Sequence, residues 1–206
     1  RNCYAGQTWN DVPDGRRLFI GWMASSKEAV YEDMPFNQQM SFPREFSLRA
    51  TGDGIRLFAQ PAREIAKLHA NERRWSDVTL AAGGNPLAGI EGELFDITAD
   101  LELTGAKSVK LDIRGIPIVY DAGTSSLSCL GKSVQVAAAG GRLDLRAIVD
   151  RTSIEIFSGG GRYVMAFCFK PDSDNRKLGL TAEGGGAKVR SLTVRRLKPS
   201  LPAAAN

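Results

Sequence analysis

An unusual mixture of residues occurs in the stretch Met34-Pro35-Phe36-Asn37-Gln38-Gln39-Met40-Ser41-Phe42-Pro43-Arg44-Glu45-Phe46-Ser47-Leu48. Its polar centre carries amide groups that both donate and accept hydrogen bonds, and a buried amide needs a partner or a ligand. Pro35 and Pro43 fix φ and lack an N–H donor, so neither end suits a helix interior. The stretch therefore predicts a β-loop-β unit. Its flanking apolar side chains are expected to be buried; they are Met34, Phe36, Met40 and Phe42.

The chain has the composition of a folded globular protein. Of its 206 residues, 43% are hydrophobic and 24% are charged, which argues against disorder and against a fibrous protein. The length suits one large all-β domain or two smaller ones. Its apolar runs are too short to span a bilayer, so no membrane partner is expected. The net charge of +4 is thinly spread, and no nucleic-acid partner is expected either.

Metal and cofactor chemistry have little support in the sequence. The three cysteines cannot all pair, no C-x-x-C spacing occurs, and His69 is the one histidine, so no metal and no cofactor are expected. The cysteines are expected to be buried structural thiols. Because the sequence begins with Arg1 and shows no leader, secreted, periplasmic and cytoplasmic locations all stay open.

The first sixty residues alternate as strands do. Glycine- and aspartate-rich turns at residues 10–15 and 51–54 divide the alternating runs into two hairpins. Residues 1–60 are therefore expected to form one four-stranded antiparallel sheet. The expected strands are Tyr4–Trp9, Arg16–Met23, Arg44–Ala50 and Ile55–Gln60.

A linker is expected over residues 61–71, either extended or with a single helical turn after Pro61. His69 lies in it without a nucleophile or a carboxylate pattern beside it, so a structural role is favoured over that of a catalytic base. Residues 72–198 then show about ten short alternating runs with regular turn signals, which predicts an antiparallel β-sandwich, and residues 199–206 form a tail. Five acidic residues fall on outward positions of the sandwich strands, with solvent as the expected partner; they are Asp96, Asp100, Asp112, Asp144 and Glu155.

Aromatic and amide residues of the first sheet could line a polar pocket. Aromatic faces stack on sugar rings and amides bridge sugar hydroxyls, although the same residues also suit an ordinary core and a satisfied polar loop. The candidate binding residues are Trp22, Asn37, Gln38 and Gln39, with Tyr4 and Gln7 as further candidates.

Four segments together resemble glycoside hydrolase family 32, the family of levanases, inulinases, invertases and sucrose-6-phosphate hydrolases. The segments are Tyr4-Ala5-Gly6-Gln7-Thr8-Trp9, residues 14–23, residues 34–45 and Asp150-Arg151-Thr152-Ser153-Ile154-Glu155-Ile156-Phe157. The resemblance implies an all-β chain that forms the last blade of a five-bladed β-propeller followed by a C-terminal antiparallel β-sandwich. It also implies that the missing N-terminal propeller blades are a partner of this piece.

The family resemblance further implies that the catalytic residues lie outside this chain. The family's nucleophile, its transition-state-stabilising aspartate and its acid/base glutamate belong to motifs that do not occur here, so no catalytic residue is assigned. The resemblance therefore implies the C-terminal fragment of a retaining β-fructofuranosidase acting on fructose-containing oligo- or polysaccharides, inactive in isolation. A non-catalytic carbohydrate-binding or structural β-sandwich module remains the alternative.

Overall fold

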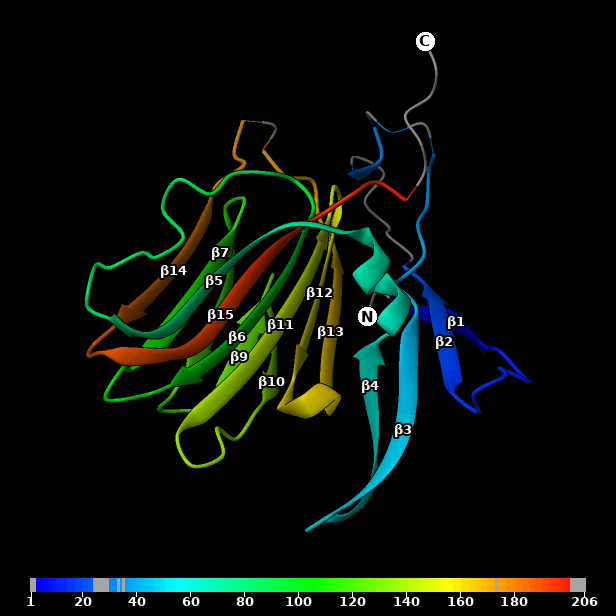
Figure 1. Cartoon of the computed structure of the whole chain (residues 1–206), viewed down its shortest axis with the longest axis horizontal. Coiled ribbons are helices and arrows are strands. Elements are labelled where there is room, and N and C mark those ends of the chain that lie inside the picture. Colours follow the sequence, from blue (N-terminus) through cyan, green and yellow to red (C-terminus); the bar gives the residue numbers. More distant parts are fainter. Residues whose placement is uncertain (1–2, 24–29, 33, 35, 173, 201–206) are drawn as a thin grey trace.

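The computed structural model describes residues 3–23, 30–32, 34, 36–172 and 174–200. Over these residues the regular secondary structure is almost entirely β-strand, arranged in a four-stranded, a five-stranded and a six-stranded sheet. The expected all-β class is confirmed. Figure 1 shows the four-stranded sheet standing beside the other two, with strand β4 (Gly54–Pro61) nearest to them.

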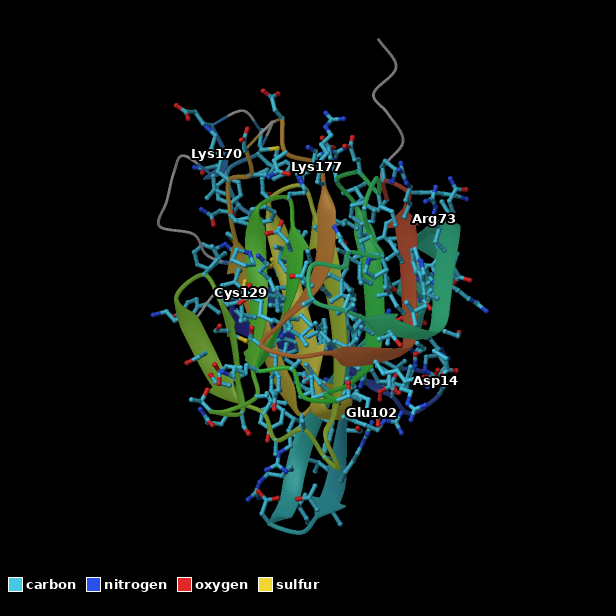
Figure 2. All side chains as sticks on the ribbon, turned by 90° about the vertical axis from the view of Figure 1, so that its left-hand side faces the viewer. Asp14, Arg73, Glu102, Cys129, Lys170 and Lys177 are labelled. Carbon is cyan, nitrogen blue, oxygen red and sulfur yellow. The ribbon has the colours of Figure 1, made fainter. Side chains whose placement is uncertain are left out.

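The four-stranded sheet has the order β1-β2-β3-β4, with every neighbouring pair antiparallel. Its strands are β1 (Tyr4–Thr8), β2 (Arg17–Trp22), β3 (Arg44–Thr51) and β4. The turn before β2 uses Gly15 at φ 71°, a conformation that glycine adopts without steric cost, and the Gly15 N–H donates to the Val12 carbonyl. The hairpin of β3 and β4 projects beyond the rest of the molecule (Figure 2).

The other two sheets pack face to face as a sandwich. Apolar residues that alternate along the strands point inward from both sheets and form one core, which includes Phe95, Leu111, Tyr120 and Ile156. The five-stranded sheet consists of β10 (Lys132–Gln135), β9 (Ser126–Cys129), β8 (Ile116–Asp121), β7 (Ser108–Ile113) and β14 (Leu178–Glu183) in that order. The six-stranded sheet consists of β13 (Tyr163–Cys168), β12 (Ser153–Ser158), β11 (Arg142–Asp150), β6 (Phe95–Glu102), β15 (Ala187–Leu197) and β5 (His69–Leu80).

The junction between the two parts is shorter than expected. A 3-10 helix over Arg63–Leu68 fills most of the expected linker, and a short one over Gly159–Gly161 follows β12. Strand β5 begins at His69 and takes in the end of the expected linker, before the boundary predicted at residue 72. Sequence periodicity missed this strand because β5 is an edge strand whose residues 70–74 are all exposed, so apolar alternation is lost there.

Two of the five carboxylates expected to face solvent are fully buried. Asp96 and Glu155 do point outward from the sandwich, but each has an exposed fraction of 0%. Asp96 accepts hydrogen bonds from the Arg146 guanidinium at 2.9 and 2.7 Å, and its Oδ2 lies 2.8 Å from Nε2 of His69. Glu155 is covered by the four-stranded sheet. The prediction of solvent exposure failed for Asp96 and Glu155 because other parts of the chain cover the outer face of the six-stranded sheet at these two positions.

Other expectations about burial were wrong as well. Of the three free cysteines, Cys129 is buried and Cys168 half-buried, but Cys3 is exposed. Phe36 and Met40 are also about half exposed, at 48% and 50%. Within the described residues there is no helix long and apolar enough to cross a membrane, and no cluster of three or more potential metal ligands.

Candidate functional site

Three of the predicted binding residues meet on one face of the four-stranded sheet. Tyr4 and Trp22 are cross-strand partners in the β1–β2 ladder, and their rings pack edge to face with centroids 6.0 Å apart. The indole N–H of Trp22 donates a 3.0 Å hydrogen bond to Oε1 of Gln38. The amide nitrogen of Gln38, an exposed residue, takes no part in this bond. Tyr4, Trp22 and Gln38 are called the aromatic–amide cluster below.

The remaining candidates lie around the cluster. Gln7 pairs with Ile20 on β2, two residues before Trp22, so Gln7 shares the face of Tyr4 and Trp22. Its side chain is exposed, as is that of Asn37, the residue before Gln38. Both therefore border the aromatic–amide cluster, without a described contact that joins them to it.

Backbone hydrogen bonds hold the polar loop against the end of β2. Met23 N–H donates to the carbonyl of Gln39 at 2.9 Å, and Ser41 N–H donates to the carbonyl of Gly21 at 2.8 Å. The Ser41 hydroxyl accepts a further bond of 3.0 Å from the Gly21 N–H. The loop thus continues the antiparallel ladder between β2 and β3 through the Trp22–Met40 bridge, and this ladder sets the position of Gln38 relative to Trp22.

Gln39 lies apart from the aromatic–amide cluster and faces the sandwich. Its side-chain amide donates to the carbonyl of Thr152 at 3.2 Å, and its Oε1 accepts from the Thr152 hydroxyl at 3.1 Å. The same amide donates to Sγ of Cys168 at 3.2 Å, and that thiol donates to the carbonyl of Met23. Burial and the neighbouring thiol raise the pKa of the Tyr31 hydroxyl at this junction. Gln39 therefore has its partners within the protein.

A buried ion pair lies next to this junction. Nη2 of Arg44 lies 2.6 Å from Oε2 of Glu155, and Phe42 N–H donates to the other carboxylate oxygen at 2.6 Å. Burial raises the pKa of the Glu155 carboxyl, while the charge of Arg44 and the hydrogen bonds from Phe42 and Arg44 oppose that shift. The pair is fully engaged in joining the sheet to the sandwich. It is not free for acid/base chemistry.

The aromatic–amide cluster offers a ring face and amide hydrogen-bonding groups but no carboxylate. Such a surface can bind a polar ring compound that carries hydroxyl groups, but it lacks the pair of carboxyl groups that a retaining glycosidase needs. Comparison with known protein families then identifies the chain. The sequence matches the description "Glycosyl hydrolases family 32 N-terminal domain" over residues 1–61 and "Glycosyl hydrolases family 32 C terminal" over residues 64–196.

The chain belongs to glycosyl hydrolases family 32. A levanase of Bacillus subtilis (strain 168) is 28% identical over 225 residues, which cover 96% of this chain and 33% of the levanase. A levanase of Bacillus sp. (strain L7) is 32% identical over 233 residues, covering 96% of this chain and 24% of that protein. The family 32 chain described here thus spans a third or less of the length of these relatives.

Solved structures of the family share its fold. The exo-inulinase from Aspergillus awamori superimposes with a TM-score of 0.83 at 20% identity, covering 97% of this chain and 44% of the inulinase. The fructan 1-exohydrolase IIa from Cichorium intybus gives a TM-score of 0.75 at 16% identity, covering 96% of this chain and 48% of that enzyme. Both the four-stranded sheet and the sandwich are therefore arranged as in larger proteins of this family.

Sequence reasoning missed the residues that join the two parts. Thr152, Cys168 and the Arg44–Glu155 pair hold the polar loop from the far side, and none of them was expected to contact it. One signal was present in the sequence: Glu155 interrupts an otherwise apolar run from Ile154 to Phe157, and a buried strand tolerates a carboxylate only beside a partner.

Proposed function

We propose that this chain is the C-terminal part of a retaining β-fructofuranosidase of the levanase type. In this proposal, residues 1–60 belong to the last blade of a five-bladed propeller, and the sandwich that follows it begins with β5 at His69. One observation carries the proposal: the two family 32 descriptions match consecutive parts of the chain, and the curated relatives that extend far beyond it include two levanases.

The surface of the four-stranded sheet supports the assignment to a propeller blade. Leu48, Ile55 and Leu57 lie on one face of β3 and β4 and are 72%, 69% and 50% exposed. A contiguous apolar face of this kind is uncommon on a surface that stays in water. In a propeller, an adjacent blade would cover such a face.

In the proposed reaction, the catalytic carboxyl groups come from the rest of the enzyme and this chain contributes binding residues. Retaining glycosidases need two carboxyl groups about 5 Å apart, one as nucleophile and one as acid and then base. The family motifs that carry these groups do not occur in this sequence. The chain is therefore proposed to contribute the aromatic–amide cluster as part of the wall around the fructosyl unit and to be inactive by itself.

Replacing Trp22 with alanine in the longer enzyme tests this role. If the ring contacts the fructosyl unit, kcat/KM for sucrose should fall by an amount equivalent to roughly 1 to 3 kcal/mol. If Trp22 is instead a core residue, the melting temperature should fall, because truncating a buried aromatic costs about 3 to 5 kcal/mol of stability. Trp9→Ala is the matched control, since Trp9 is 46% exposed and lies beyond the end of β1, away from Trp22.

Two outcomes would contradict the proposal. One is an unchanged kcat/KM in a folded Trp22→Ala variant. The other is an equal loss in the Trp9→Ala variant, which would show that the effect is not specific to the aromatic–amide cluster.

A further inference from the structure

One contact between the sandwich and the polar loop has no role in the proposed function described so far. Thr152, at the turn between β11 and β12, forms two reciprocal hydrogen bonds with the side chain of Gln39, at 3.2 and 3.1 Å. Thr152 is only 3% exposed, so both bonds are shielded from water. A reciprocal pair fixes the orientation of an amide as well as its position, because the donor and acceptor ends cannot be exchanged.

The contact continues from Gln39 to the aromatic–amide cluster. The carbonyl of Gln39 accepts from the N–H of Met23, the residue that follows Trp22, and Gln38 accepts from the indole N–H of Trp22. The path from Thr152 to the indole thus passes through one side chain and one residue of loop backbone. A shift of Gln39 would move Gln38 with it, since adjacent Cα atoms are held about 3.8 Å apart.

We propose that Thr152 is a positioning residue, which holds Gln39 so that Gln38 and the indole of Trp22 keep the arrangement that a fructosyl unit requires. Through Thr152 the sandwich takes part in substrate specificity without contacting substrate. This proposal rests on the proposed function for its kinetic consequence. Its structural consequence, a dependence of the Trp22 environment on the Thr152 hydroxyl, does not.

Thr152 is a better test position than Glu155. Glu155 and Arg44 form a buried ion pair, so replacing either affects the stability of the whole junction. Thr152→Val removes one donor and keeps the side-chain shape and the backbone carbonyl. Thr152→Ser keeps the donor and removes a methyl group. The comparison of the two variants isolates the hydroxyl.

The first measurement uses the 206-residue chain itself, in a background where Trp9 and Trp75 are replaced by Phe so that Trp22 is the remaining tryptophan. Thr152→Val should raise the acrylamide-quenching constant of Trp22 and shift its emission to longer wavelength. Thr152→Ser should restore the parental values. Val189→Ala is the control for general destabilisation, because Val189 is fully buried in the sandwich core, and it should leave the Trp22 signal unchanged.

The second measurement uses the longer enzyme with sucrose. Misplacement of a binding group costs rate through lost orientation, so Thr152→Val should lower kcat/KM by about 3-fold to 10-fold, with recovery in Thr152→Ser and no change in Val189→Ala. If Thr152→Val does not fold, Gln39→Met removes the bond to the Thr152 hydroxyl from the opposite side, together with the bonds that the Gln39 amide donates to the Thr152 carbonyl and the Cys168 thiol. It should change the Trp22 signal and lower kcat/KM at least as much as Thr152→Val.

The outcomes separate the two proposals. An unaltered Trp22 signal in Thr152→Val, or in Gln39→Met where the first variant is unfolded, overturns the positioning role. The positioning role is also overturned if Trp22→Ala lowers kcat/KM while Thr152→Val changes the Trp22 signal and leaves kcat/KM unchanged. If Trp22→Ala has no kinetic effect either, the proposed function has failed, and the Trp22 signal still decides whether Thr152 positions the indole.

Discussion

Arg44 and Glu155 form a buried ion pair across the boundary between the four-stranded sheet and the sandwich, with Nη2 and Oε2 2.6 Å apart. Arg44 is 6% exposed and Glu155 is 0% exposed, and the backbone N–H of Phe42 satisfies the second carboxylate oxygen. The desolvation of both charges is offset only while the two parts stay together. The two parts of the chain should therefore unfold as one cooperative unit.

We expect Arg44→Met to lower the free energy of unfolding by about 3 to 5 kcal/mol, because it leaves the Glu155 carboxylate buried without its counter-charge. Urea denaturation followed by circular dichroism measures the change. The loss should shrink as the pH is lowered, because burial already raises the pKa of Glu155 and removal of Arg44 raises it further, so protonation removes the buried charge.

The exposed pair between Arg56 and Asp53 serves as the matched control. Both side chains are about half exposed, at 43% and 50%, and Arg56→Met should change stability by less than about 1 kcal/mol. If Arg44→Met and Arg56→Met lower the free energy of unfolding by similar amounts, the buried pair contributes no more to stability than the exposed pair.

We expect Asp96→Asn to destabilise the chain by about 1 to 3 kcal/mol, since it removes a buried charge that both Arg146 and His69 contact. Asp100→Asn is the control on the same face of β6: Asp100 pairs with Arg142, and its side chain is 30% exposed. The control should cost under about 1 kcal/mol. Thermal unfolding of both variants checks the ranking, and equal costs would contradict it.

Acid should weaken the exposed network around Arg16. The hydrogen bonds from Arg16 to Glu64 lower the pKa of Glu64 from its ordinary value of 4.5 to about 2. Because the pKa of Glu64 is lower in the folded chain than in the unfolded chain, its ionised carboxylate stabilises the fold at any pH above the unfolded-state pKa. This stabilisation is lost as the pH falls through the folded-state pKa. The stability difference between the parent and Glu64→Gln should therefore be constant above pH 4.5 and shrink toward pH 2. A stability difference that stays constant between pH 4.5 and pH 2 would show that the ionisation of Glu64 does not contribute to stability.

The purified 206-residue chain should release no fructose from sucrose, levan or inulin. The family motifs that carry the paired carboxyl groups do not occur in this sequence, and binding energy alone does not replace a carboxylate nucleophile and a carboxylic acid proton donor. A reducing-sugar assay at high protein concentration measures this. Fructose release that disappears when any carboxylate of this chain is replaced would overturn the expectation.

Local regularities were sufficient to predict much of the fold. Strands β3 and β4, at Arg44–Thr51 and Gly54–Pro61, lie within one residue of the expected bounds, because the turn at residues 51–54 separates two clearly alternating runs. The motifs at residues 4–9 and 34–45 indicated the family without any structure, since they concern which residues follow one another along the chain.

The tertiary structure alone decided which outward-facing residues are buried. Period-two alternation assigns Glu155 and Asp96 to the outer face of their sheet, but it carries no information on whether another element covers that face. The four-stranded sheet covers Glu155, and Arg146 and His69 engage Asp96.

For the polar loop, too, the sequence pattern does not show which side chains another part of the chain contacts. Gln38 and Gln39 are adjacent and chemically identical, yet Gln38 accepts from Trp22 while Gln39 bonds to Thr152 in the sandwich. Neighbouring residues of an extended chain point to opposite sides, so one amide contributes to the candidate site and the other to the junction. Only the docking of the sandwich decides which glutamine belongs to the candidate site and which to the junction, because the partners of the Gln39 side chain are 113 and 129 residues away in the sequence.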